Sequence, residues 1–388
     1  MPKRFDAVVV GCGISGAAAA FFLSQRGMSV ALFDRGGPAS GGTGLSAAIV
    51  RQHYSTPLML RLAQKSVEIF RDASALLGHD AGYRRAGYVF LTPPDALDAT
   101  RRVLDMKREL GIPSELFATE QLATSFPWLN PDGVAAAAFE PDGGYADPET
   151  ATTAFLEAAK AQGAVVHLKT PVRALLRDGE RIIGIQTDAE DVTAGIVVNA
   201  AGPWSAPLAV SAGLPLTMRA VREQDTVWEA RAGRPLPETS VSNAVDAIYI
   251  RPLGERRFIV GRGFPKLYTD VDPYNYKRTA DPDFITDVQE RMTRRVPGLG
   301  GARLIHAYAA LYDVTADWYP YVGPRDGVQG YADFNGGSGH GFKIAPAIAR
   351  ELAGWLVDGT VADDFRRLSH DRVARNDLFV QAYGGNRG

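Results

Sequence analysis

The chain has 388 residues, of which 46% are hydrophobic and 22% are charged, and its formal net charge is −2. This length exceeds what one hydrophobic core usually supports, so it predicts two domains. The balanced charge offers no basic surface for a polyanion, so we expect no nucleic-acid partner.

Cysteine content and hydropathy bear on the cellular compartment, on metal binding and on membrane association. Cys12 is the only cysteine, which excludes an internal disulfide and a cysteine-based metal centre and is typical of a reducing compartment. No stretch approaches about 18 uninterrupted apolar residues, and Met1-Pro2-Lys3-Arg4 leads directly into a strand. We therefore expect a cytoplasmic protein with no metal site and no membrane partner.

The N-terminal part begins with a β-α-β pattern. Asp6–Val10 and Val30–Phe33 are short apolar runs with strand character, and Ile14–Gln25 between them is a small-residue helical stretch. This order predicts a parallel strand pair. One helix is then predicted over 58–77 and an alternating strand over 83–91, where the chain leaves the first sheet.

Later segments predict a return to that sheet and a second sheet. Residues 127–144, with three prolines and an Asp-Gly-Gly turn, indicate a surface excursion, whereas the alternation over 219–263 is typical of an antiparallel sheet. In chain order, the remaining helices are predicted over 96–111, 148–162, 284–296 and 345–356, and the strands over 164–168, 182–186, 196–199, 226–229, 247–251, 257–260, 303–311 and 329–333.

The element order predicts an α/β fold, α+β overall, in which a Rossmann-like dinucleotide domain is interrupted by an antiparallel substrate domain. The first domain is expected to comprise residues 1–82, 145–215 and 322–388. The second is expected to comprise residues 83–144 and 216–321.

A dinucleotide motif stands in the first strand–helix turn. Gly11, Gly13 and Gly16 match G-x-G-x-x-G between a predicted strand and a predicted helix, and Asp34 ends the next strand. Gly11 suits a tight turn, Gly13 a close approach to pyrophosphate and Gly16 close helix packing, while Asp34 can bind ribose hydroxyls. A nicotinamide enzyme would usually continue with βα units, so the early departure from the sheet favours FAD.

A second glycine-rich turn occupies residues 336–343 and runs into the last predicted helix. Its glycines let a ligand approach the backbone, and the free N–H groups and dipole of a helix N-terminus favour negative charge. Lys343 adds a cation in the first turn. The sequence therefore predicts an anion site here.

Several motifs together resemble the D-amino acid oxidase superfamily of FAD-dependent oxidoreductases, and most closely the sarcosine oxidases and glycine oxidase. The likeness spans nearly the whole chain. The motifs, in chain order, are Gly11 to Gly16 with Asp34, Ile49-Val50-Arg51-Gln52-His53-Tyr54, Asn199 to Trp204, Tyr249 to Pro252, Asp313 to Pro324, and Ser338 to Lys343.

The resemblance implies oxidation of the C–N bond of a small amino acid or N-alkyl amino acid, with hydride transfer to flavin N5 and hydrolysis of the imine. It implies that Arg51 and Lys343 hold the substrate carboxylate and that Tyr249 lies over the same pocket. A guanidinium fork and an ammonium point charge suit a carboxylate in a dry site. The expected partners are thus a small anionic amine and an electron acceptor.

Further site residues are expected beside these. His53 and His340 are candidate acid/base groups, although either ring could instead serve packing, and His340 could act through its backbone N–H. The complete set of expected FAD contacts is Gly11, Gly13, Ile14, Ser15, Gly16, Asp34, Arg35, Ser46, Val172, Ala200, Gly202, Trp204, Gly337, Gly339, His340, Gly341, Phe342 and Lys343.

Two departures from the family pattern bear on the chemistry. Monomeric sarcosine oxidases link the flavin to a cysteine in the segment that corresponds to 309–312, and this chain has none there, so FAD is expected to be non-covalent. They also place an oxygen-activating lysine where Ile259 aligns, which leaves oxygen and another electron acceptor both open.

Three readings of function remain open at this point. The first is C–N oxidation of a small amino acid. The second is dehydrogenation of a 2-hydroxy acid, or tailoring oxidation of a larger amine, by the same cofactor. The third is a non-enzymatic FAD-binding subunit of a larger complex, which the presence of Arg51, Lys343 and the glycines disfavours. The sequence gives no indication of oligomeric state.

Overall fold

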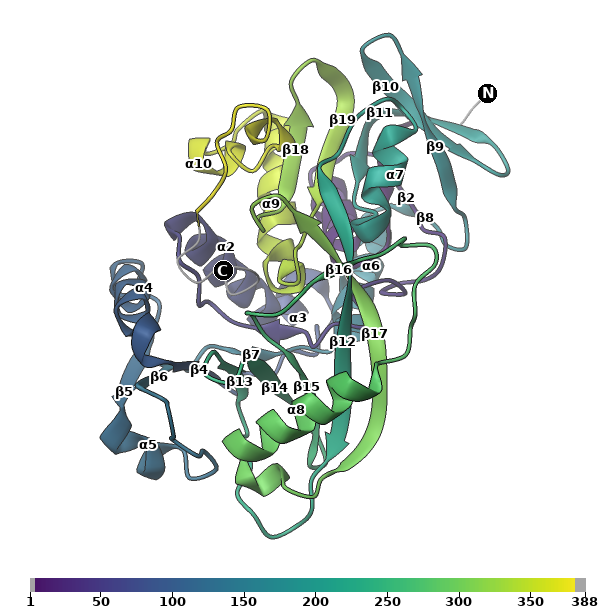
Figure 1. The fold of residues 1–388 in the computed structure, drawn as a ribbon. Helices are drawn as coiled ribbons and strands as arrows, with labels where there is room; N and C mark the ends of the chain where they lie inside the picture. The colour runs from purple at the N-terminus through teal and green to yellow at the C-terminus, as the bar shows by residue number, and fades with distance from the viewer. Residues whose placement is uncertain (1–3, 381–388) are drawn as a thin grey trace.

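The computed structural model describes residues 4–380, and it confirms the mixed α/β class (Figure 1). An eight-stranded sheet contains the parallel order β8-β2-β1-β11-β19, with β18 antiparallel at one edge. Its strands are β1 (Arg4–Val10), β2 (Val30–Phe33), β8 (Val165–His167), β9 (Val172–Asp178), β10 (Arg181–Thr187), β11 (Asp191–Asn199), β18 (Tyr321–Arg325) and β19 (Val328–Asn335).

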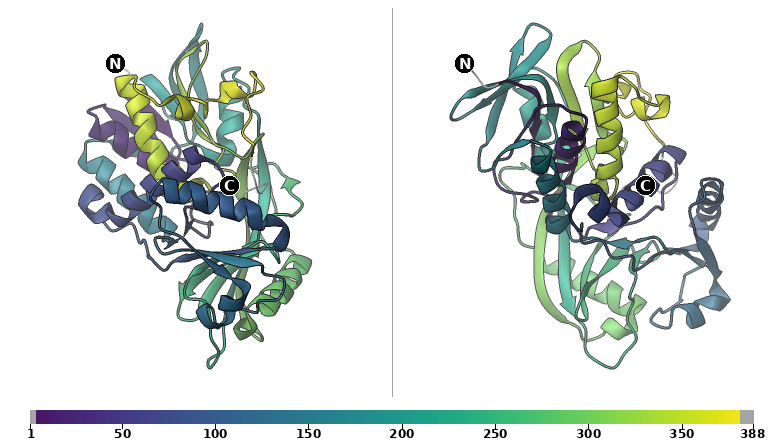
Figure 2. Two further views of the ribbon diagram at one scale, coloured as in Figure 1. Left: turned by 90° about the vertical axis from the view of Figure 1, so that its left-hand side faces the viewer. Right: turned by 180° about the vertical axis from the view of Figure 1, so that it is seen from behind.

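A second, nine-stranded sheet forms the other half of the molecule, and Figure 2 shows its long strands β12 and β17 running side by side. Its strands are β4 (Tyr88–Thr92), β5 (Glu115–Ala118), β6 (Ala136–Glu140), β12 (Met218–Glu229), β13 (Ser240–Asn243), β14 (Ile248–Gly254), β15 (Arg257–Arg262), β16 (Thr269–Asp270) and β17 (Arg303–Thr315). β3 (Ile49–Val50) and β7 (Gly144–Tyr145) pair in a separate two-stranded ribbon. Each of them stands at a point where the chain passes from one large sheet to the other.

Helices cover the first sheet because its strands are apolar on both faces. Helices α1, α6 and α9 pack together over one face, in a core that includes Phe21, Phe155 and Ile348, whereas Leu208 of α7 packs on the other. The helices are α1 (Ile14–Gln25), α2 (Pro57–Arg71), α3 (Ala73–Leu77), α4 (Leu97–Glu109), α5 (Thr119–Ser125), α6 (Pro148–Ala161), α7 (Ser205–Val210), α8 (Pro282–Arg295), α9 (Gly341–Asp358) and α10 (Asp363–Arg366). Within residues 4–380, none of them is long and apolar enough to cross a membrane.

Several predicted elements differ in the structure. The helix predicted over 58–77 is two helices, because the chain bends at Asp72 between α2 and α3. The strand predicted over 83–91 begins only at Tyr88, after the left-handed Gly87. Residues 127–144 are not only a surface excursion, because Ala136–Ala138 of β6 are buried between β4 and β5.

Candidate active site

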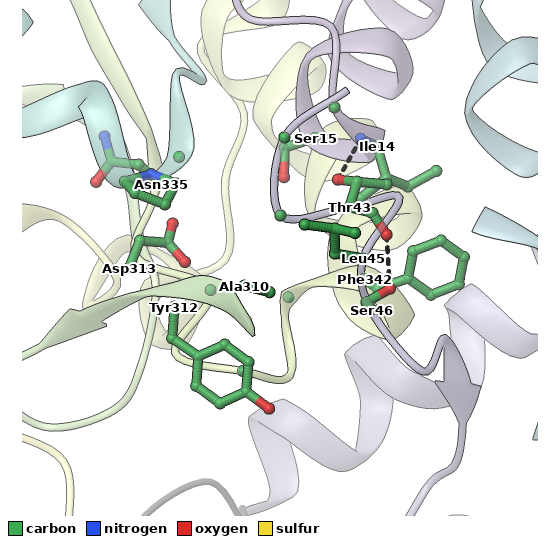
Figure 3. A pocket seen from close by; sticks show the side chains of 18 of the residues that line it. Ile14, Ser15, Thr43, Leu45, Ser46, Ala310, Tyr312, Asp313, Asn335 and Phe342 are labelled. Carbon is green, nitrogen blue, oxygen red and sulfur yellow. Dashed lines mark hydrogen bonds between the residues drawn. The ribbon is translucent and has the colours of Figure 1, made fainter. Parts of the chain in front are cut away.

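A cavity of about 840 Å³ lies between the two sheets and takes residues from both. Figure 3 looks into it, with Ile14, Ser15 and Thr43 on one side and Tyr312 and Asn335 on the other. This volume is typical of cofactor and substrate sites.

The nucleotide end of the cavity is the turn between β1 and α1. Gly11 has φ +109°, and a Cβ atom there would lie 2.3 Å from the carbonyl oxygen of Ala200. The Asp34 carboxylate accepts hydrogen bonds from the backbone N–H groups of Cys12 at 2.7 Å and Gly36 at 2.6 Å. The turn therefore packs closely against Ala200 and is fixed by Asp34, at the carboxyl ends of parallel strands, where dinucleotides bind.

An aromatic and cationic group borders the same end. The guanidinium of Arg35 lies 3.7 Å from the ring centroid of Trp204, and Trp204 Nε1 donates a hydrogen bond to the carbonyl of Pro273 at 3.1 Å. Val172, at the start of β9, also lines the cavity. Arg35 and Trp204 thus form a stacked pair in the cavity lining.

The second glycine turn is anchored to the end of β17. The N–H of Gly336 donates to Asp313 Oδ2 at 2.8 Å, and the N–H of Ser338 donates to the Asp313 carbonyl at 3.0 Å. A Cβ atom on Gly339 would lie 2.4 Å from the Tyr312 ring. Glycine is needed there because the backbone lies against an aromatic side chain.

Arg51 and Lys343, the two residues that the resemblance implies as substrate ligands, both line the cavity although they are far apart in the sequence. Both are buried, with 6% and 7% of their surface exposed. Arg51 donates to the carbonyl oxygen of His53 and lies over the Tyr54 ring, and Lys343 Nζ lies 3.5 Å from the carbonyl oxygen of His340. No carboxylate in residues 4–380 forms an ion pair with Lys343.

Burial sets the electrostatics of this pair. It lowers the pKa of Lys343 well below its usual value, and the positive charge of Arg51 lowers that pKa further. A bound anion would raise it again by stabilising the ammonium form. The pair therefore favours a ligand that carries a negative charge.

The two predicted acid/base histidines lie outside the cavity lining. His340 Nε2 donates to the Trp318 carbonyl at 2.7 Å, its Nδ1 lies 3.3 Å from the Tyr54 hydroxyl, and burial lowers its pKa to about 3. His53 is fully buried, and its ring stacks on Phe90 at 4.3 Å. Each ring thus packs among buried neighbours outside the cavity lining.

The other predicted residues are placed as follows. Tyr249 lines the cavity, and its hydroxyl donates to Asp225 Oδ1 at 2.5 Å. Gly16 lies behind the lining, where a Cβ atom would lie 1.8 Å from the Gly11 carbonyl oxygen. The predicted cofactor residues that line the cavity are Gly11, Gly13, Ile14, Ser15, Asp34, Arg35, Ser46, Val172, Ala200, Gly202, Trp204, Gly337, Gly339, Gly341, Phe342 and Lys343.

Some lining residues were not predicted. Thr43 follows a Gly41-Gly42 pair, a signal of a second glycine-rich loop, and its hydroxyl accepts from the N–H of Ile14 at 3.2 Å. Asp225 lies within strand β12, and no sequence motif around it indicated a site residue. Asn335 ends β19, and its Oδ1 atom has no hydrogen-bond partner in the described part of the chain.

The family follows from comparison with known proteins. A family model described as FAD dependent oxidoreductase matches residues 6–355. The chain belongs to this family. Its cofactor is therefore FAD, and the glycine turns and the buried Asn335 oxygen fit such a ligand.

Relatives extend the comparison. Monomeric sarcosine oxidase from Streptomyces avermitilis is 26% identical, over 96% of this chain and 99% of the relative. 4-Methylaminobutanoate oxidase (formaldehyde-forming) from Paenarthrobacter nicotinovorans is 27% identical over 99% of this chain, which spans only 48% of that protein. The predicted resemblance to sarcosine oxidases is confirmed.

Solved structures agree with this assignment. L-proline dehydrogenase from P. horikoshii superposes with a TM-score of 0.89 at 27% identity, covering 98% of this chain and 100% of that one. Glycine oxidase from Geobacillus kaustophilus gives a TM-score of 0.82 at 25% identity, covering 95% of this chain and 99% of that one.

Proposed function

We propose that the protein oxidises the C–N bond of a small amino acid or N-alkyl amino acid. The observation that carries this proposal is the pair of buried cations, Arg51 and Lys343, in the wall of the FAD cavity. Relatives named sarcosine oxidase, glycine oxidase and L-proline dehydrogenase, which all carry amino acid names, support the same substrate class.

The proposed roles follow from charge and position. Arg51 and Lys343 bind the substrate carboxylate, which fixes the orientation of the rest of the molecule in the cavity. Tyr249 lines the same cavity and bounds the substrate on the second sheet. Bound FAD would accept the hydride that leaves the carbon next to nitrogen.

The cofactor end is proposed to hold FAD without a covalent bond. The strand β17 has no cysteine over 309–312, and Cys12 is buried in the turn after β1. Acid precipitation of the yellow protein should therefore release the flavin into the supernatant.

The division into two domains is also proposed: residues 1–82, 145–215 and 322–388 bind FAD, and residues 83–144 and 216–321 bind substrate.

Anaerobic titration of the purified yellow protein tests the function. Glycine, sarcosine, dimethylglycine, proline and lactate are added separately while the flavin absorbance is followed. Bleaching by at least one amino acid is expected. If lactate alone bleaches the flavin, the protein is a hydroxy acid dehydrogenase; if none of a broad amine panel does, the proposal is wrong.

Admission of air to the reduced protein then tests the electron acceptor. Among the described residues that line the cavity, Lys343 is the only lysine, and it belongs to the proposed carboxylate site. We therefore expect slow reoxidation by oxygen and faster reoxidation by an artificial acceptor dye. Rapid reoxidation in air would make the protein an oxidase.

A further inference from the structure

Three neighbouring strands of the second sheet place Asp225, Gly261 and Tyr249 in one row. Asp225 of β12 pairs with Gly261 of β15, and Gly261 pairs with Tyr249 of β14. The Tyr249 hydroxyl reaches across the glycine and donates to Asp225 Oδ1 at 2.5 Å. Residues that pair directly across strands point to the same face, so the row forms one patch.

The patch requires the glycine at its centre. A Cβ atom on Gly261 would lie 2.3 Å from both Asp225 Oδ1 and the Tyr249 hydroxyl oxygen. Glycine inside a strand costs stability, and it often marks a site where another group must approach the backbone closely. At this position the approaching group is the Asp225–Tyr249 pair.

Asp225 is a buried acid in the cavity wall. It is 5% exposed, it lines the same cavity as Arg51 and Lys343, and none of the ion pairs within residues 4–380 includes it. A buried carboxylate without an ion pair is costly, so a cationic ligand would stabilise it. The cavity thus holds cations in one part of its wall and an acid in another.

The surroundings of Asp225 tune its protonation. Burial raises its pKa to about 7, while the hydrogen bond from Tyr249 and the charge of Lys266 lower it, and Glu223 raises it. The titratable and charged groups that face it, from the neighbouring strands and the loop after β15, are Glu223, Tyr249, Lys266, Tyr308 and Tyr312. Lys266 forms its ion pair with Glu223 and not with Asp225, so the Asp225 carboxylate has no ion-pair partner among the described residues and lines the cavity.

We propose that Asp225 binds the ammonium group of the substrate and removes its proton, and that Tyr249 positions the Asp225 carboxylate. The proposal rests on the proposed amine oxidation. One N–H bond of the ammonium breaks, an O–H bond forms on Asp225, and the nitrogen keeps the electron pair. The substrate is then a neutral amine, the form from which a hydride can leave.

This assignment defines the substrate class more closely. The substrate enters as a zwitterion, with its carboxylate on Arg51 and Lys343 and its ammonium on Asp225. A neutral alcohol in place of the ammonium would lose the charge interaction with Asp225. The cavity therefore favours amino acids over 2-hydroxy acids.

Binding of two probes tests the ammonium site without turnover. Glycine betaine carries a carboxylate and a permanent cation, whereas acetate carries the carboxylate alone; both are titrated at pH 8 by the change in flavin absorbance. In the FAD-loaded Asp225→Asn variant, betaine binding should weaken at least tenfold more than acetate binding. An equal effect on both probes would overturn the proposal.

The pH dependence of kcat/KM for the best amine tests the proton transfer. Wild-type activity should rise with pH through about 7, as Asp225 loses its proton. In Asp225→Asn, this rising limb of the pH profile should be absent, and kcat/KM at neutral pH should fall about 100-fold or more. Tyr249→Phe should move this rising part of the pH profile to higher pH, because the hydrogen bond from Tyr249 lowers the pKa of Asp225 and its loss raises that pKa.

Gln224→Ala is the matched control, because Gln224 is adjacent in β12 but bonds to Asp281 on the other face. It should leave both the limb and the probe affinities unchanged. If amines reduce the flavin and Asp225→Asn keeps the wild-type pH profile, this inference fails while the proposed function stands. If no amine reduces the flavin, the proposed function fails, and the probe titration still decides whether Asp225 binds cations.

Discussion

Glu140 Oε2 accepts a hydrogen bond from the backbone N–H of Gln52 at 2.7 Å, and both residues are buried. Glu140 also pairs with Lys107 of α4, and its Oε1 lies 3.7 Å from His53 Nδ1. A carboxylate at the end of β6 therefore fixes the segment that follows Arg51. The second sheet thereby helps to set the position of a proposed substrate-binding residue.

Glu140→Gln should destabilise the protein by about 3–5 kcal/mol, because it leaves the buried Lys107 ammonium without a countercharge. Urea unfolding measures this loss. The double variant Glu140→Gln/Lys107→Met removes both charges and should recover most of the stability. A single variant as stable as wild type would show that the buried pair contributes little.

Replacing Arg51 by Gln or Lys343 by Met should raise the substrate KM by about 10- to 100-fold, since a hydrogen bond to a charged group contributes roughly 1.5–3 kcal/mol. Flavin content should stay at the wild-type level. Lys65→Ala, which removes an exposed lysine paired with Glu351, is the control and should leave KM unchanged. An unchanged KM in both cavity variants would remove Arg51 and Lys343 from the site.

Gly11→Ala should yield colourless protein. The added Cβ would overlap the Ala200 carbonyl, and the φ of +109° is strained for alanine. Gly27→Ala is the matched control, because Gly27 also has positive φ, +84°, but a Cβ atom there meets nothing within 4 Å. The ratio of flavin absorbance to protein absorbance compares the two, and a fully yellow Gly11→Ala would contradict the prediction.

His340 should make folding stability depend on pH. Burial lowers its pKa from 6.5 to about 3, so the unfolded chain binds more protons between these values. The neutral ring therefore contributes its full stability above pH 6.5, and this contribution is lost as the pH falls toward 3, by up to about 1.4 kcal/mol per pH unit. His340→Gln should remove this slope.

The measurement for His340 is the difference in unfolding free energy between wild type and His340→Gln at several pH values. The raised pKa of Asp225 gives an opposite slope, but it is common to both proteins and cancels in the difference. A difference that stays constant from pH 7 to pH 4 would mean that the ring titrates normally in the folded state.

The site residues that could be predicted from the sequence are those that belong to recognisable motifs. The two glycine turns predicted segments that line the cavity, and the family resemblance singled out Arg51 and Lys343, which both line it although they are far apart in the sequence. Asp225 could not be found this way. Its significance depends on pairing across three strands, and the pairing register is a tertiary property that no local pattern encodes.

For a related reason, the sequence alone left the roles of the two histidines open. A histidine in a glycine-rich turn suggests proton transfer. In the structure, the orientation of the His340 ring is set by its hydrogen-bond partners, the Tyr54 hydroxyl and the Trp318 carbonyl, which no local sequence pattern indicates. Similarly, the prolines near Ala136–Ala138 suggested surface, whereas an alanine run without charge is free to be buried between two strands.

The cofactor end of the cavity is assembled from the turn after β1, residues 200–204 and the turn before α9. Bound FAD would therefore contact three segments that are far apart in the sequence. Because FAD would bind the folded form alone, a free concentration 100 times its Kd would add about 2.7 kcal/mol to the unfolding free energy. The supply of flavin would then govern the melting temperature and protease resistance of the whole chain.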